Sequence, residues 1–232
     1  MIKRPAFWAR RTHKWIALVI AVQALLWMAS GLYMTAISID TIHGDHLVRE
    51  TRQPLVPNHA WIDADTLARA FPDMHSFRLK QWQGRAVYEV HGGDAVTLVD
   101  AVSGDRLSPL DELATRKLAA SMYIGSAPIQ SARLLPESPA EVSTRPAPLW
   151  RVEFADSRQT AFYFSPTTGE LLAKRHDLWR WFDFMWMLHI MDYAERSDVN
   201  NTLLRVSSVI GLAFSISGIW LLFYSFRRRR RA

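Results

Sequence analysis

Residues 15–39 read WIALVIAVQALLWMASGLYMTAISI, and residues 206–226 read VSSVIGLAFSISGIWLLFYSF. Neither stretch contains a charged side chain. A helix of about 20 apolar residues is long enough to cross the hydrocarbon core of a bilayer. We therefore expect two transmembrane helices, one near each end of the chain, with everything else arranged around them.

Basic residues flank both stretches on the side that faces the chain termini. They are Lys3, Arg4, Arg10, Arg11 and Lys14 before the first stretch, and the arginines at 227–231 after the second. Because basic flanks mark the cytoplasmic side of a membrane, residues 1–14 and 227–232 are predicted to be cytoplasmic tails. The sequence thus predicts a bacterial inner-membrane hairpin whose residues 40–205 lie in the periplasm.

The first apolar stretch also differs from a cleaved signal peptide. The apolar part of a signal peptide is roughly 7–15 residues long and precedes a cleavage site of small residues. The run at residues 15–39 is much longer. We expect an uncleaved anchor.

The net charge of +6 follows from the two tails. Each tail carries five basic residues, so the rest of the chain has a net charge of −4. A nucleic-acid-binding protein would concentrate basic residues on its folded domain, and we predict no nucleic-acid partner. The tails instead favour contact with the anionic headgroups of the lipid bilayer.

Cysteine is absent from the chain. This excludes a thiolate nucleophile, an iron–sulfur cluster held by cysteine, a cysteine zinc site and covalently attached c-type haem. Any metal or cofactor must be held by other side chains, such as histidine or carboxylate.

An internal repeat lies within the exported segment. Residues 85–107 read RAVYEVHGGDAVTLVDAVSGDRL, and residues 149–172 read LWRVEFADSRQTAFYFSPTTGELL. Apolar residues alternate in each copy and are bounded by turn residues, which predicts a β-hairpin. The expected strands are residues 87–90, 95–99, 150–154 and 160–164. Each hairpin is followed by a turn with glycine and an acidic residue, at 104–105 and 169–170.

Short helices are expected next to both hairpins. Asp63 begins a helical pattern that ends at Pro72, and residues 110–124 form a second pattern. Residues 128–148 contain five prolines and are expected to be a connector. The predicted fold is therefore α+β, with two transmembrane helices flanking two antiparallel β-hairpins and short helices.

A helix followed by a hairpin of this form, occurring twice, resembles the PepSY domain. The two ends extend the likeness. RTHKW at residues 11–15 precedes a helix that closes on Ser-Gly-Leu at 30–32, and Leu-His at 188–189 precedes a helix with Ser-Gly-Ile at 217–219. These segments resemble the PepSY-associated transmembrane family, whose members typically carry a histidine before a helix ending in Ser/Thr-Gly-aliphatic. The resemblance covers nearly the whole chain.

The resemblance implies a function in electron transfer. Larger members of this family have four membrane helices, and some bind b-type haem between them and reduce ferric siderophores. The present chain has only the first and last helices of that pattern. The resemblance therefore implies an inner-membrane subunit of an electron-transfer or iron- or metal-reduction system, with His13 and His189 as candidate ligands of haem b.

His13 and His189 are expected at opposite membrane surfaces. His189 lies in an aromatic segment, about residues 177–192, that is too short to span and suits an interfacial helix. That segment is alternatively a plain aromatic anchor. Because a spanning helix rises roughly 35–40 Å at 1.5 Å per residue, the two imidazoles are not expected to ligate one iron. A second axial ligand would have to come from another chain.

A second candidate site is the His-Gly-Asp-His motif that follows the first helix. His43 and His46, with Asp45 between them, could chelate a metal ion, and copper or zinc suits these ligands. The remaining histidines are expected to be ordinary surface residues.

Small residues recur along both apolar stretches. They predict that the helices pack closely, since small side chains allow close approach in lipid, and Gln23 midway along the first stretch also calls for a partner. We expect a homo-oligomer or a complex with another membrane subunit. The candidate packing residues are Ala17, Ala21, Gln23, Ala24, Gly31, Gly211, Ser215 and Gly218.

Two functions remain open at this point. The first is the electron-transfer subunit, with a periplasmic redox partner. The second is a non-catalytic, membrane-tethered PepSY module that binds, scaffolds or regulates an exported protein. A bound haem would favour the first, and an exposed apolar strip on the hairpin sheet would favour the second.

Overall fold

The computed structural model describes residues 5–49, 54–55 and 60–225. Lys3, Arg4, His59 and the tail at 227–232 lie outside the described residues. The chain divides into two compact units, Met1–Ser38 with Trp181–Ala232, and Ile39–Arg180. The first is named the helical unit and the second the sheet unit.

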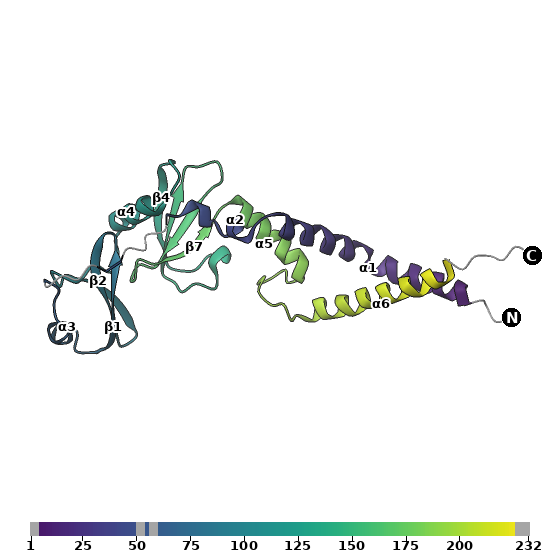
Figure 1. Ribbon diagram of the computed structural model, residues 1–232, viewed down its shortest axis with the longest axis horizontal. Helices are drawn as coiled ribbons and strands as arrows, with labels where there is room; N and C mark the ends of the chain where they lie inside the picture. The colour runs from purple at the N-terminus through teal and green to yellow at the C-terminus, as the bar shows by residue number, and fades with distance from the viewer. Residues whose placement is uncertain (1–4, 50–53, 56–59, 226–232) are drawn as a thin grey trace, which may run out of the picture. The chain divides into compact units, whose positions relative to one another are not determined.

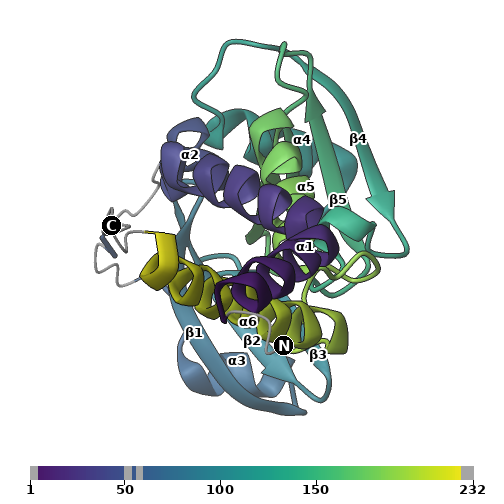
Figure 2. The ribbon, with the colours of Figure 1, turned by 90° about the vertical axis from the view of Figure 1, so that its right-hand side faces the viewer.

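Two long apolar helices dominate the helical unit. α1 (Pro5–Ala36) and α6 (Thr202–Ser225) lie side by side (Figure 1, Figure 2). Both are long and apolar enough to cross a membrane, which confirms the two apolar helices expected from the sequence. α1 begins earlier than expected, so Arg10, Arg11 and Lys14 belong to the helix itself.

One stripe of α6 faces α1. The partly or fully buried residues of α6 recur every three or four positions, as expected for a single helix face. They are Leu204, Ser207, Ile210, Gly211, Phe214, Ser217, Gly218, Leu221 and Tyr224. Between them lie exposed apolar side chains such as Val209 and Leu212. The outward face of α6 is therefore apolar as well.

The helical unit also contains most of α5 (Asp177–Ile190), within which the boundary between the units falls. This confirms a helix in the aromatic segment at about 177–192. Trp181 and Phe184 are exposed on it, with their rings in an edge-to-face contact.

The first repeat of the sheet unit is a helix and three antiparallel strands (Figure 1). α3 (Ala64–Ala70) begins where the Asp63 carboxylate accepts a hydrogen bond from the Thr66 amide at 2.7 Å, a standard N-cap. The sheet order is β1 (Met74–Trp82), β2 (Arg85–Gly92) and β3 (Ala95–Asp100). The hairpin β2–β3 was expected, whereas β1 was not.

The second repeat has the same order with one more strand. α4 (Glu112–Met122) is N-capped by Asp111, and four antiparallel strands follow. They are β4 (Ile129–Leu135), β5 (Leu149–Phe154), β6 (Ala161–Phe164) and β7 (Leu171–Arg175). The expectation that residues 128–148 are only a connector is wrong, because they contain β4 and the short 3-10 helix η2 (Ala140–Val142). Pro128 and Pro136 flank this edge strand without interrupting it, as edge strands permit.

The turns after β3 and β6 are equivalent, and this confirms the repeat. The Asp100 amide donates to the Asp105 carbonyl at 2.9 Å, and the Ser165 amide donates to the Glu170 carbonyl at 3.0 Å. Gly104 and Gly169 hold the same place in the two turns, at φ of +75° and +63°. Glycine adopts such angles without a steric cost from Cβ, which is why both turns carry it.

Each repeat has its own apolar core. Leu67, Tyr88 and Val99 are buried in the first, and a larger cluster around Phe162 and Phe164 lies in the second. The 3-10 helix η1 (Asp45–Leu47), which follows α2 (Ile39–His43), adds Leu47 to the second cluster. Trp82 of the first repeat packs against the same cluster. The two repeats thus form one unit.

Candidate cofactor site in the helical unit

His13 of α1 is held by α6. Its Nδ1 lies 2.9 Å from the Ser217 Oγ. Its ring stacks on Phe214, with 4.6 Å between the ring centroids and 14° between the planes. A hydrogen bond and a stacked ring together fix both the position and the tilt of this imidazole.

His189, on the last turn of α5, makes the equivalent hydrogen bond to α1. Its Nδ1 lies 2.9 Å from the Ser30 Oγ. Ser30 and Ser217 are both buried, with 0% and 5% of their surface exposed. Water therefore has no access to these two hydroxyls, and the partner of each Nδ1 is a protein group.

A glycine lies next to each imidazole. A Cβ atom added to Gly218 would lie 3.4 Å from the Cε1 of His13, and one added to Gly31 would lie 3.7 Å from the Cε1 of His189. Each Ser-Gly pair therefore supplies a hydroxyl and an open surface to one ring. The sequence repeats the unit histidine–helix–Ser-Gly, and the structure pairs the histidine of each unit with the Ser-Gly of the other.

The distance between the two sites is shorter than predicted. Seventeen residues separate His13 from Ser30 on α1, which corresponds to about 25 Å along the helix axis. The predicted separation of roughly 35–40 Å counted the whole spanning helix. The conclusion that one iron cannot join the two rings is unchanged, since both would have to lie within about 2 Å of it.

Side chains satisfy the last carbonyls of α5, which a helix C-terminus leaves without intrahelical partners. The Trp27 Nε1 donates to the His189 carbonyl at 2.7 Å, and the Asn201 Nδ2 donates to the Ile190 carbonyl at 2.8 Å. The Gln23 Nε2 is 3.4 Å from the Leu188 carbonyl. Gln23, predicted to indicate a partner chain, thus has a hydrogen-bond partner within its own chain.

The predicted small-residue stripes are only partly covered within the chain. A Cβ atom added to Gly211 would lie 3.4 Å from the Trp27 Cζ3, so the Trp27 ring covers this glycine. The His13 ring covers Gly218 in the same manner. Ala17, Ala24 and Gly31 are half-buried, whereas Ala21 and Ser215 are exposed. Sequence reasoning missed Ser30, Ser217 and Trp27 as the residues that contact the histidines, although both serines belong to the motif that it singled out.

The predicted metal site at His43 and His46 lies in the sheet unit, and both side chains are exposed. Asp45 accepts a hydrogen bond from the Lys174 Nζ at 2.5 Å, and Arg158 Nη1 lies 3.4 Å from the His46 Nε2. Within the described part of the chain, no group of three potential ligands gathers at any point. One basic side chain thus contacts Asp45 and another contacts His46, and both disfavour a bound cation there.

His176 is fully buried, and the prediction that it is an ordinary surface residue is wrong. Its ring centroid is 5.9 Å from that of His46, and neither ring nitrogen makes a hydrogen bond of good geometry, although the backbone at Thr41 and Ile42 lies close by. Burial lowers the pKa of His176, and the nearby charge of His46 lowers it further. Nothing in the local sequence marks this histidine, because its ring packs closely over Gly44, which is distant in sequence.

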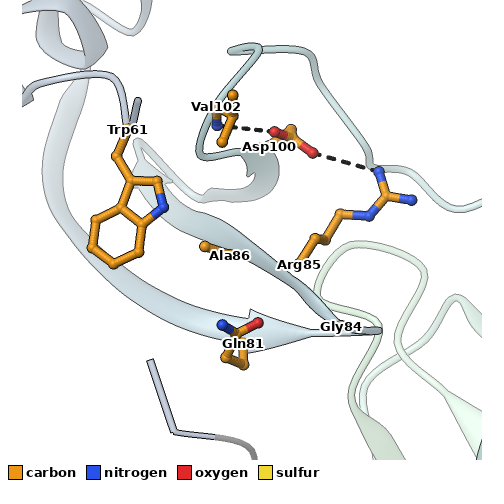
Figure 3. A pocket seen from close by; sticks show the side chains of 7 residues that line it. All are labelled: Trp61, Gln81, Gly84, Arg85, Ala86, Asp100 and Val102. Atoms are coloured by element: carbon orange, nitrogen blue, oxygen red, sulfur yellow. Dashed lines mark hydrogen bonds and ion pairs between the residues drawn. The ribbon is translucent and has the colours of Figure 1, made fainter. Parts of the chain in front are cut away.

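Two shallow pockets of about 380 and 400 Å³ lie on the sheet unit. The first is lined by residues of the β1–β2 hairpin and of the turn after β3, with Trp61 at its side (Figure 3). Its charged groups bind one another, since Arg85 Nη1 is 3.4 Å from Asp100 Oδ2 and Asp100 Oδ1 accepts from the Val102 amide at 2.9 Å. The pocket therefore presents no unpaired charge for chemistry.

Comparison of the chain with protein-family models, curated proteins and solved structures finds no match.

Proposed function

We propose that this chain is an inner-membrane electron-transfer or metal-reduction subunit, related to the PepSY-associated transmembrane family, in which His13 and His189 hold b-type haem. The observation that supports this proposal most directly is the reciprocal placement of the two imidazoles. Each has its Nδ1 bound to a buried serine and a glycine beside its Cε1.

The outward faces of the helices support placement in a membrane. Leu18, Val22, Leu212 and Phe223 each expose more than 60% of their surface. Contiguous apolar surface of this kind is rare on soluble monomers and is expected against lipid. With the basic flanks on the cytoplasmic side, the sheet unit is then periplasmic, and His189 belongs to the outer leaflet.

The donor set suits haem. Imidazole is the common axial ligand of b-type haem iron, and the absence of cysteine is compatible with non-covalent binding. Haem iron, when bound, carries one electron between its ferric and ferrous states. The chain's own residues hold the imidazoles in place, exclude water with the apolar helix faces, and leave Nε2 as the ring atom that is not bound to serine.

Each chain supplies one histidine at each of two levels along α1, His13 at one and His189, beside Ser30, at the other. Because about 25 Å separates the two levels along α1, bis-histidine ligation needs a second copy of the chain or another membrane subunit. The exposed small residues Ala21 and Ser215 leave room for such a neighbour. We therefore include a homo-oligomer or membrane partner in the proposal.

A tethered PepSY module is the alternative. Hydrogen bonds between helices also stabilise packing in lipid without any cofactor, so the His–Ser contacts would then be purely structural. Absorption spectra of the detergent-purified protein, oxidised and dithionite-reduced, separate the two functions. A Soret band with sharpened visible bands on reduction is expected, and a colourless protein from haem-sufficient cells would favour the tethered module.

A further inference from the structure

The hydroxyl protons of Ser30 and Ser217 are already used by the helix backbone. The Ser30 Oγ lies 2.7 Å from the Leu26 carbonyl oxygen, and the Ser217 Oγ lies 2.7 Å from the Phe214 carbonyl oxygen. A carbonyl oxygen has no proton to give, so a hydrogen bond of this length requires the serine to donate. A serine hydroxyl has a single proton, and in both residues it is therefore committed.

The histidine must then donate to the serine. With its proton on the carbonyl side, each Oγ presents only lone pairs to the Nδ1 that is 2.9 Å away. An unprotonated Nδ1 would place its lone pair against a lone pair of a buried serine oxygen. The proton of each neutral imidazole thus belongs on Nδ1, because the partner at one ring nitrogen determines the tautomer.

This assignment leaves the lone pair of both rings on Nε2. That nitrogen is the one able to ligate a metal or accept a proton, and a hydrogen bond donated by the other ring nitrogen makes an imidazole a stronger electron donor. Gly31 and Gly218 keep side-chain atoms away from the adjacent Cε1 edge.

We infer that Ser30 and Ser217 are positioning residues, each of which fixes the tautomer of the histidine contributed by the other half of the repeat. Ser30 sets His189, and Ser217 sets His13. The role of these serines in preparing haem ligands rests on the proposed function. The tautomers themselves do not require a bound cofactor.

The test is ¹⁵N NMR of the cofactor-free, full-length protein with ¹⁵N-labelled histidine, in detergent at a pH where the imidazoles are neutral. The protonated and unprotonated ring nitrogens have well-separated shifts, so the tautomer is read directly. In the wild type, Nδ1 of both His13 and His189 should be protonated. Finding the proton on Nε2 of either ring would overturn the inference, whatever the variants do.

The variants should act crosswise. Ser30→Ala should convert most of His189 to the Nε2-protonated tautomer and leave His13 unchanged, while Ser217→Ala should do the reverse. Ser30→Thr and Ser217→Thr, which keep the hydroxyl, should restore the wild-type shifts. Thr35→Ala and Ser215→Ala are matched controls, because these exposed hydroxyls bond only to backbone carbonyls of their own helices.

The outcomes separate the two proposals. Alanine variants that leave both tautomers unchanged would refute the positioning role even if the protein binds haem. Crosswise tautomer changes in a protein that never binds haem would sustain the positioning role and refute the proposed function.

Discussion

At the scale of single residues, His176 shows how far a side chain can depart from its sequence context. The His176 imidazole is fully buried, and its burial and the charge of His46 lower its pKa more than the backbone at Ile42 and Thr41 raises it, so the neutral form of the ring is favoured. His46 and Arg158 provide positive charge nearby, which disfavours a second positive charge on His176.

The sheet unit should therefore lose stability in acid through His176. Its pKa is lowered in the folded chain, so below about pH 6.5 the unfolded chain binds the extra proton first. Stability rises with pH across this window and falls as the pH drops through it. His176→Leu should flatten the dependence of the melting temperature on pH between about 5 and 7, whereas the exposed control His75→Gln should keep it. Equal slopes for wild type and His176→Leu would contradict the account.

The residues of the candidate cofactor site were predictable only in part. His13, His189, Gly31 and Gly218 stand in a repeated pattern that the sequence displays. The pairing of each serine with its histidine depends on tertiary packing, because His13 and Ser217 are 204 positions apart and Ser30 and His189 are 159 positions apart. No local pattern encodes this pairing. Trp27 was missed because an aromatic residue in an apolar helix is expected to face lipid or its partner helix.

At the scale of elements, helix caps and hairpins were predictable because their signals are local. Asp63 was expected to begin α3 and is its N-cap, and the alternation in β2, β3, β5 and β6 is visible in the sequence. The cap of α4 at Asp111 was not predicted, since that helix was expected to begin at residue 110. The strand β1 was missed because many of its side chains are exposed, including Phe77 and Arg78, and its apolar alternation is therefore weak. β4 was missed because its neighbouring prolines suggested a loop.

Two glycines with positive φ, one in the turn after β6 and one in the turn between β1 and β2, have different surroundings. Gly169 and Gly84 both have positive φ, at +63° and +78°. A Cβ added to Gly169 would lie 2.7 Å from the Trp82 Nε1, whereas nothing lies within 4 Å of one added to Gly84. Gly84→Ala should cost about 1–2 kcal/mol for the left-handed conformation alone, and Gly169→Ala should cost about 1–3 kcal/mol more for overpacking. Similar denaturation midpoints for the two variants would show that Trp82 does not constrain this turn.

The C-terminal end of α5 should depend on Trp27. Trp27→Phe removes the donor to the His189 carbonyl and leaves a part-buried acceptor without this partner, at a cost of about 1 kcal/mol. Gln23→Leu should cost less, because its contact of 3.4 Å is long. Hydrogen exchange at the last turn of α5, measured in detergent, should accelerate most in Trp27→Phe. Unchanged protection in that variant would argue against this hydrogen bond as a determinant of the helix end.

At the scale of the whole molecule, the proposed arrangement is a membrane hairpin with one exported domain. The two apolar helices were predictable because they come directly from composition, and the structure confirms them, whereas the orientation and the exported location of the sheet unit stay predictions. Composition does not identify a cofactor or a partner chain, because neither of them leaves a periodic or compositional pattern in the sequence.

The proposed topology predicts the accessibility of defined positions. A single cysteine introduced at the exposed Ser143 of this cysteine-free chain should react with a membrane-impermeant maleimide in intact spheroplasts. A cysteine at Ala232, in the predicted cytoplasmic tail, should react only after lysis. Labelling of the second position in intact spheroplasts, with the first protected, would reverse the proposed orientation.

The central claim is that His189 holds a haem, and the spectrum of one variant tests it most directly. The visible spectrum of purified His189→Ala is compared with those of the wild type and of His91→Ala, a histidine of the sheet unit that contacts Glu89. The account predicts that the Soret band is lost or strongly reduced in His189→Ala and retained in His91→Ala. A Soret band that survives in His189→Ala and disappears in His91→Ala would contradict it.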